Sequence, residues 1–291
     1  MKTSIKILLP VYNTIDQLYH TLVSLENQDC RDFSVDIHDN NSTDGSSELI
    51  CEFIKNTNIK TKFIKHNQNI GGAKNFLSLI NKVDDDYFMF LDSEDKISKS
   101  YVSSALKIIK NVNPDVIIPI FYEWGLNDKK RIINGPFEIA NTQKNLRLSS
   151  ISAMCNTSGL GYFFYGIYKG NKFKYIFEQI LNRASINPSI HLSEDIAFSY
   201  VVALIADQIE IAYNSELMHF SKCIVDDNRM LLNSHGIKDI LTVTPEEVYF
   251  EALEIIDELN LIDKSKTKQI KQIIEIKSEL KKLQLSLALS L

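Results

Sequence analysis

The chain has 291 residues, of which 44% are hydrophobic and 24% charged, the balance of a folded globular protein with one large domain or one domain plus an appendage. Its net charge of −5 disfavours a protein that binds nucleic acid mainly through phosphate contacts. The four cysteines are scattered, without a CxxC pair, which disfavours a disulfide scaffold or a zinc site and favours a reducing compartment. Neither a signal peptide nor an apolar run of about 18 residues is visible, so we expect a cytoplasmic protein.

The first 120 residues alternate between short apolar runs and stretches of helical periodicity. Strands are predicted at five runs, 5–9, 33–38, 60–65, 87–91 and 116–121. Helices are predicted between them, around 18–25, 49–54, 71–81 and 98–110. This alternation predicts an α/β fold with a mostly parallel sheet covered by helices on both faces. Ligands of such sheets bind beyond the carboxyl ends of the strands.

The rest of the chain is divided by its composition. Residues 122–156 are polar and weakly periodic, 160–220 carry mixed signals, and the pattern is helical from Pro245 onward. We therefore expect a domain at 1–225, with halves 1–121 and 122–225, and a helical region at 226–291. Near the end, an apolar stripe with 3–4 spacing runs beside several lysines and consists of Ile273, Ile276, Leu280, Leu283 and Leu287. The body of the protein, a second copy or an anionic membrane surface would cover this stripe.

Carboxylates follow two of the predicted strands. Asp39 begins the polar segment 39–46, where a carboxylate can accept the imide N–H of a uracil-like base. The competing interpretation of this segment is a polar turn in which Ser42, Thr43 or Asp44 caps a helix. The second segment, 91–95, has three acids in four residues, which repel one another unless a cation or protons neutralise them. Hard divalent cations bind such oxygens, whereas the alternative is a solvated acidic turn.

Three further segments carry polar side chains with two interpretations each. The pair Glu194-Asp195 would supply an acid or base, or would only suit the positive end of a helix dipole. His219 would bind a metal or phosphate, or be structural. The glycine-containing loop 67–75 allows close backbone approach to a ligand, and Lys74 would face a phosphate or solvent.

In their order, these segments resemble the family-2 inverting glycosyltransferases with the GT-A fold, over about 5–222. Leu9-Pro10-Val11-Tyr12-Asn13 is similar to the family's opening Pro-x-Tyr-Asn motif, and segment 39–46 to its Asp-Asp-Gly-Ser-Thr-Asp-Gly-Ser motif. Segment 69–75 resembles its Asn-x-Gly-x-x-x-Ala-Arg-Asn segment, and 91–95 its Asp-x-Asp motif. Glu194-Asp195 resembles its later Glu-Asp pair. The fold implied is a Rossmann-like nucleotide-binding sheet with a helical C-terminal extension.

The resemblance implies a role for each matched residue. Tyr12 would flank the nucleobase, Asp39 would bind its imide, and Asp195 would be the general base for the acceptor hydroxyl. A divalent cation, Mn²⁺ or Mg²⁺, would be held by Asp92, Glu94 and His219. The nucleotide sugar would be bound by a set of residues from the matched segments, namely Pro10, Tyr12, Asn13, Asp39, Asn69, Lys74, Asp92, Ser93 and Lys222.

The implied activity is transfer of a hexosyl or N-acetylhexosaminyl unit from a UDP-sugar. The acceptor would be a hydroxyl of a glycan or lipid-linked oligosaccharide for a bacterial surface polysaccharide, lipopolysaccharide or capsule. Through its C-terminal helix, the chain would form a homo-oligomer or contact the cytoplasmic face of the inner membrane.

The chain departs from the family pattern at three positions. Glu94 replaces an Asp, so Asp95 is a rival metal ligand; Asn40 replaces an Asp; and Lys74 replaces an Arg, giving a point charge instead of a fork. The alternative function is therefore a catalytically degenerate nucleotide-sugar-binding protein, or a scaffold that assembles through its C-terminal helix. A nucleotidyltransferase is disfavoured, because the segment Pro10 to Asn13 stands where such enzymes have a glycine-rich, arginine-containing loop.

Overall fold

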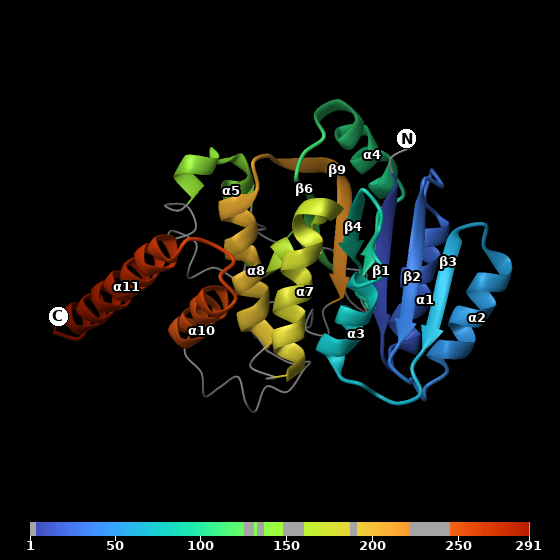
Figure 1. Ribbon diagram of the computed structural model, residues 1–291, viewed down its shortest axis with the longest axis horizontal. Coiled ribbons are helices and arrows are strands. Elements are labelled where there is room, and N and C mark those ends of the chain that lie inside the picture. Colours follow the sequence, from blue (N-terminus) through green and yellow to red (C-terminus); the bar gives the residue numbers. More distant parts are fainter. Residues whose placement is uncertain are drawn as a thin grey trace.

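The computed structural model describes residues 4–124, 131–132, 137–147, 160–186, 191–220 and 245–290. In this part of the chain, nine strands form one sheet in the order β3-β2-β1-β4-β8-β6-β9-β5, and β7 pairs with β6 outside that path. The strands are β1 (Ile5–Val11), β2 (Phe33–Asp39), β3 (Lys60–Lys65), β4 (Tyr87–Phe90), β5 (Lys96–Ile97), β6 (Val116–Trp124), β7 (Arg131–Ile132), β8 (Ile167–Lys169) and β9 (Ile209–Phe220). Helices cover both faces of the sheet (Figure 1).

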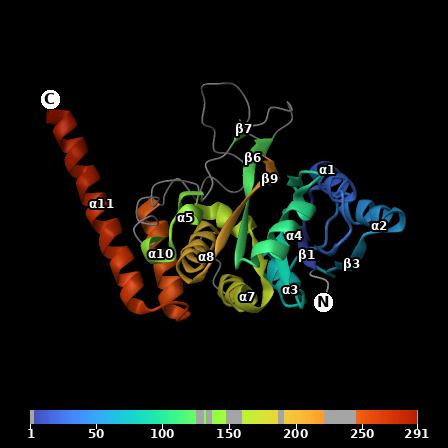
Figure 2. The same cartoon turned by 90° about the horizontal axis from the view of Figure 1, so that it is seen from above.

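The first four strands form a parallel sheet with helices on both of its faces. Helices α1 (Ile15–Glu26) and α2 (Ser46–Asn56) connect β1 to β2 and β2 to β3, stepping toward one edge of the sheet. Helix α3 (Gly72–Ile80) then crosses back over β1 to reach β4. Because such crossovers are right-handed, α3 lies on the opposite face from α1 and α2 (Figure 2). The carboxyl ends of β1, β2 and β4 consequently meet at one edge.

The second half of the sheet mixes directions. Strand β8 is antiparallel to β4 and β6, β9 is parallel to β6, and β5 is antiparallel to β9. Helix α4 (Tyr101–Val112) precedes β6, and the short elements α5 (Phe137–Asn141), η1 (Lys144–Leu146) and η2 (Leu160–Tyr165) follow it. The β6–β9 register shifts between Pro119 and Ile120, where β9 takes up extra residues. A bulge accommodates a proline, which has no N–H to donate to the ladder.

The predicted fold class is confirmed, and the structure adds detail to the predicted elements. Strands and helices occur at all the predicted positions before residue 122, but β1 continues through Pro10 to Val11. Pro10 lies beyond the residues that pair with β4, so its missing N–H is tolerated. The two-residue strand β5 was not predicted, because two residues show no periodicity. Helix α8 begins at His191, so the Glu194-Asp195 pair lies near its start.

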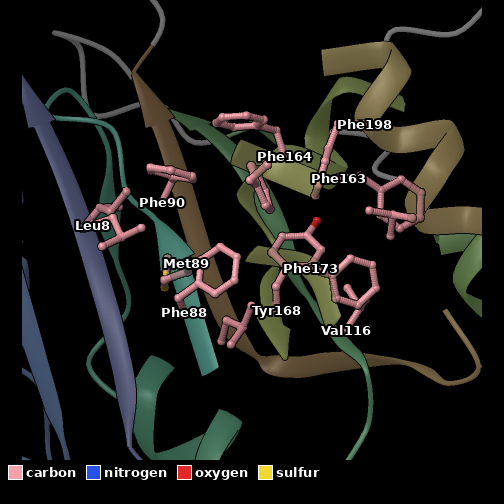
Figure 3. Packing of buried hydrophobic residues seen from close by; sticks show 14 of the residues in the cluster. Leu8, Phe88, Met89, Phe90, Val116, Phe163, Phe164, Tyr168, Phe173 and Phe198 are labelled. Atoms are coloured by element: carbon pink, nitrogen blue, oxygen red, sulfur yellow. The ribbon is translucent and has the colours of Figure 1, made fainter. Parts of the chain in front are cut away.

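An aromatic cluster joins the two halves of the protein. Helices α7 (Gly170–Ile186) and α8 (His191–Ile205) pack with η2 against β4 and β8, and their rings interdigitate (Figure 3). Phe90 of β4 stacks on Phe164 with centroids 5.4 Å apart, and Phe198 of α8 lies 3.8 Å from Phe177 of α7. Such pairs add about 0.5–1.5 kcal/mol each beyond the burial of their area. The cluster therefore fixes α8 relative to the parallel half of the sheet.

The C-terminal helices extend this core. Helix α10 (Pro245–Glu258) packs on α8 and buries Leu253 and Ile256, while α11 (Lys264–Ser290) packs on α10 through its first turns. The remainder of α11 diverges from the rest of the protein (Figure 2). Among the described residues, none of the helices is both long and apolar enough to cross a membrane.

A buried histidine ties β2 to α3. His38 is 2% exposed, and its Nδ1 lies 2.6 Å from the hydroxyl of Ser78. The Asn75 side chain donates to the His38 carbonyl at 3.1 Å, and the His66 ring lies 5.8 Å from that of His38. Burial, followed by the nearby His66 and Lys82, lowers the pKa of His38 to about 4. His38 is therefore neutral in the folded protein at neutral pH.

This neutrality makes the stability depend on pH. Between the ordinary histidine pKa of about 6.5 and the folded value of about 4, the unfolded chain binds a proton that the folded chain does not. We expect His38 to remove about 3 kcal/mol from the free energy of unfolding as the pH falls through this window. The stability advantage of wild type over His38→Asn should therefore shrink from pH 7 to pH 4, as measured by urea denaturation. His20→Asn, at an exposed position, controls for loss of a surface histidine; a constant advantage of wild type over His38→Asn would contradict the prediction.

Candidate active site

Asp39 organises the edge where β1 and β2 end. Its side chain is fully buried at the end of β2, where Oδ1 accepts hydrogen bonds from the Ser42 amide at 2.9 Å and the Ser42 hydroxyl at 2.5 Å. Oδ2 accepts a hydrogen bond from the Ser47 hydroxyl. The Asp39 carbonyl accepts the amide of His66 at 2.9 Å, which ties the end of β3 to the same point. The predicted uracil-binding carboxylate therefore lies at the predicted edge and also holds the loop that follows it.

That loop is connected to the end of β1 by side-chain hydrogen bonds. The Asn13 amide donates to the Ser42 hydroxyl at 2.9 Å, and the Thr43 amide donates to the Asn13 side chain at 2.8 Å. Asn13 has a φ of 52°, a left-handed conformation that asparagine adopts more readily than most residues. The predicted residue Asn13 thus shapes the turn that carries Tyr12, whose ring is 46% exposed.

Asp44 satisfies the first N–H groups of two helices. Its carboxylate accepts hydrogen bonds from the Ile15 amide at 2.9 Å and from the Ser46 amide at 3.0 Å, at the starts of α1 and α2. Burial raises the pKa of Asp44, but these hydrogen bonds outweigh burial and hold it below its usual value. Asp44 thus satisfies amides at helix starts, as the capping interpretation expected, although the N-cap residues of α1 and α2 are Thr14 and Gly45.

The third loop at this edge carries Asn69 and Lys74. The Asn69 side chain accepts from the Asn40 side chain at 2.9 Å and from the Gly71 amide at 2.8 Å. The Asn40 side chain in turn accepts the Ile70 amide at 2.8 Å. The family pattern has Asp at position 40. Asn40 donates a hydrogen bond through its NH₂ group and accepts one through its oxygen, whereas a carboxylate could only accept. Lys74 lies exposed in the first turn of α3.

The acidic turn after β4 meets the end of β9. Asp95 is fully buried, and its Oδ1 accepts a hydrogen bond from His219 Nδ1 at 2.9 Å. The antiparallel pairing of β5 with β9 produces this contact, since Lys96 is opposite Met218. The negative charge of Asp95 raises the pKa of His219 to about 9. Burial and then the charge of Asp95 raise the pKa of Asp92 to about 7.

The acidic turn is also fixed to the start of α1. The Thr14 hydroxyl donates to the Ser93 hydroxyl at 2.9 Å, and the Thr21 hydroxyl donates to the Ser93 carbonyl at 2.9 Å. Ser93 is therefore buried, while Asp92 and Glu94 on either side of it are half-buried. Thr14 is the N-cap of α1 and Thr21 lies within the helix; neither role was predicted, because their partner Ser93 is more than 70 residues away in the sequence.

Helix α8 directs its first turn toward the same edge. The amide of Asp207, just after α8, donates to Asp115, just before β6, so α8 ends at the amino edge of the sheet. Its fifteen residues span roughly 20 Å, which places Asp195, its fifth residue, at the start of the second turn and toward the carboxyl edge. The side chain of Asp195 and the whole of Lys222 lie outside the described part of the structure.

The acidic turn suits a divalent cation only when a bound substrate supplies further oxygen ligands. Among the described side chains, no group of three or more His, Cys, Asp or Glu could hold a metal ion. The predicted trio Asp92, Glu94 and His219 is therefore not assembled into a metal site. Asp92 and Glu94 nevertheless supply the hard oxygens that Mg²⁺ or Mn²⁺ requires, and such ions are often bound through one or two carboxylates plus substrate phosphates. Asp92 and Glu94 therefore fit such a cation if substrate phosphates supply its other ligands.

A cavity of about 850 Å³ lies elsewhere in the protein. Its lining includes Asp84, Asp85, Tyr87, Lys110 and Lys169, at the start of β4 and around it. This is the amino edge of the parallel strands, opposite the residues described above. It contains none of the predicted site residues.

Comparisons with known proteins agree with this geometry. Residues 6–175, more than half of the chain, match the protein family described as "Glycosyl transferase family 2". A teichoic acid poly(glycerol phosphate) polymerase from Staphylococcus epidermidis is 31% identical over 114 residues, which cover 39% of this chain and 16% of that protein. The abequosyltransferase RfbV of Salmonella typhimurium is 32% identical over 93 residues, 31% of this chain and 28% of RfbV. The matched segments thus span less than half of these relatives.

The solved structures of S. aureus TarS share the fold. TarS residues 1–349 in complex with UDP superpose with a TM-score of 0.62 and 18% identity, covering 92% of this chain and 70% of that one. The complex of the same fragment with UDP-GlcNAc gives a TM-score of 0.61 and 19% identity. The chain therefore belongs to glycosyl transferase family 2 and has the GT-A fold.

Proposed function

We propose that the chain transfers a sugar from a UDP-sugar to a hydroxyl group of a glycan or lipid-linked acceptor, with inversion at the anomeric carbon. The observation that carries this proposal is the meeting of two structures at one sheet edge. One is the hydrogen-bonded loop after β2 around Asp39, and the other is the acidic turn after β4, which pairs with His219. The first suits a nucleoside and the second suits a diphosphate with its cation.

The nucleoside half of the proposed site consists of Tyr12 and Asp39. The exposed ring of Tyr12 offers a face for the base, and the Asp39 carboxylate retains lone-pair capacity beyond the hydrogen bonds it already accepts. Because Asp39 is fully buried, we expect the base to reach it only after the Ser42 hydroxyl turns aside. The UDP and UDP-GlcNAc complexes of TarS support a uridine donor.

The diphosphate half is built on Asp92, Glu94 and His219. When bound there, Mn²⁺ or Mg²⁺ would supply positive charge against the diphosphate that leaves. Its fit is supported by the electrostatics of the turn, where burial and then the charge of Asp95 raise the pKa of Asp92 to about 7. His219 is held by Asp95 and carries a positive charge through its raised pKa, so it would also stabilise the leaving diphosphate. Asn69, Lys74 and Lys222 complete the proposed donor contacts.

Asp195 is the proposed general base. The acceptor hydroxyl attacks the anomeric carbon as the bond to the diphosphate breaks, and its proton passes to the Asp195 carboxylate. The position of Asp195 near the start of α8, which the aromatic cluster fixes at Phe198, supports this role. The names of the teichoic acid polymerase and the abequosyltransferase support a surface polymer as the acceptor.

The donor site is tested by measuring UDP affinity with and without Mn²⁺. We expect Mn²⁺ to tighten binding in wild type, because the acidic turn repels the diphosphate until a cation bridges them. Glu94→Ala should abolish most of this gain, whereas Asp39→Asn should weaken binding equally with and without Mn²⁺. Isothermal titration calorimetry gives each affinity.

The matched control for the donor site is Glu52→Ala, at an exposed position on α2. It removes one acid from the same half of the protein and should leave both affinities unchanged. Equal UDP affinity of wild type with and without Mn²⁺ would refute the metal assignment but leave the uridine assignment standing.

The general base is tested by Asp195→Asn, which keeps the size of the side chain but cannot accept a proton. Turnover, measured as UDP release in the presence of acceptor, should fall by about 10²–10⁴-fold. UDP affinity should stay within twofold of wild type. Glu194→Gln is the matched control; if it is the crippled variant and Asp195→Asn is not, the base is the neighbouring residue. Full turnover by both variants would mean that neither acid is the base.

A further inference from the structure

Among its described side chains, the long helix α11 packs on the protein mainly through one face. Thr267, Ile270 and Ile274 are buried against α10, and the Thr267 hydroxyl donates to Asp257 at 2.6 Å. These three residues lie on one side of the helix, within its first three turns. This packing explains how α11 is attached, and it does not include Ile276, the described residue of the predicted stripe that is most exposed.

The stripe begins on a different face of α11. Ile276 follows Ile270 by six residues, which at 100° per residue turns it about 120° away from the packed face. Its side chain is 56% exposed, and that of Ile273 is half-buried. By spacing alone, the same stripe continues at 280, 283 and 287, where the helix diverges from the body (Figure 2). The side chains at these last three positions are outside the described ones.

The charge of this segment is opposite to that of the rest of the chain. Residues 264–291 contain seven lysines and two glutamates, a net charge of +5. The whole chain has a net charge of −5, so the remaining residues sum to −10. The lysines whose side chains are described, Lys264, Lys266, Lys268 and Lys271, are all exposed. The segment that carries the predicted apolar stripe therefore has a net positive charge, on a chain whose other residues have a net negative charge.

We propose that α11 lies in the interface of an anionic lipid membrane, with the apolar stripe immersed and the flanking lysines against lipid phosphates. An apolar stripe with lysines beside it is the pattern of helices that lie in the membrane interface. Anionic lipid also complements the local charge of +5. A second copy of the chain suits it less, because pairing two such helices brings like charges together and the stripe covers only about two heptads. The acidic body would be repelled from the lipid surface, which leaves α11 as the contact.

The proposal is tested with the full chain and two double variants. Ile276→Asp/Leu283→Asp places two charges on the stripe. Ser278→Asp/Ser286→Asp adds the same charge to the same helix away from the stripe. Flotation with vesicles of phosphatidylcholine containing 30% phosphatidylglycerol, and with phosphatidylcholine alone, measures the bound fraction. Light scattering measures the mass of each protein, and UDP affinity reports that each is folded.

Wild type and the Ser278/Ser286 variant should float with the anionic vesicles, and less so at high salt, because screening weakens attraction to the lipid charge. The Ile276/Leu283 variant should bind these vesicles at least about tenfold more weakly, with UDP affinity unchanged. Two results would overturn the proposal. One is wild type that does not float, or floats no better than the stripe variant. The other is a wild-type dimer that the stripe variant alone loses, which would assign the stripe to a second copy. Neither result bears on the proposed transfer reaction, because that reaction is tested at Asp39, Glu94 and Asp195.

Discussion

The buried carboxylate of Asp39 is the constraint on which the candidate site depends. A carboxylate removed from water is stable only if its oxygens accept hydrogen bonds, and here the loop after β2 folds back so that Ser42 and Ser47 supply them. Ser42 in turn accepts the amide of Asn13, so that one acid holds the ends of two strands together. The exposed ring of Tyr12 follows from this arrangement, because the left-handed Asn13 turns the chain just beyond it.

In the acidic turn after β4, a buried carboxylate is stabilised by a histidine instead of by serine hydroxyl groups. Asp95 is fully buried and is paired with His219, whose strand reaches the turn only through the short pairing of β5 with β9. Burial and then the charge of Asp95 raise the pKa of Asp92 to about 7, although the charge of His219 acts in the opposite direction. One acid of the turn is therefore neutralised by the protein itself, while another retains a demand for positive charge. That demand is what a cation-bound diphosphate would meet, which links the electrostatics of the turn to the proposed chemistry.

The sequence predicted the parallel half of the fold because each of its elements carries a local signal. The run from Ile5 and the alternation from Phe33 are strands by pattern alone, and both are found. The contact between Asp95 and His219 had no such signal, since 124 residues separate them and the strand that joins them has two residues. Asp39 was predicted as a ligand contact from its place at the strand end, but its hydrogen bonds to Ser42 and Ser47 depend on how the loop closes. Asp195 remains a prediction.

Hydrogen–deuterium exchange with UDP and Mn²⁺ tests the central claim most directly, because it locates the nucleotide without any substitution. A nucleotide bound at the carboxyl edge should slow exchange in four segments, 10–14, 39–47, 69–75 and 91–95, which carry the loops joined through Asp39 and the acidic turn. The opposite edge, with its 850 Å³ cavity around Tyr87 and Lys169, should exchange at its ligand-free rate. Protection confined to segments 83–87 and 169–174, with none at 39–47, would contradict the account.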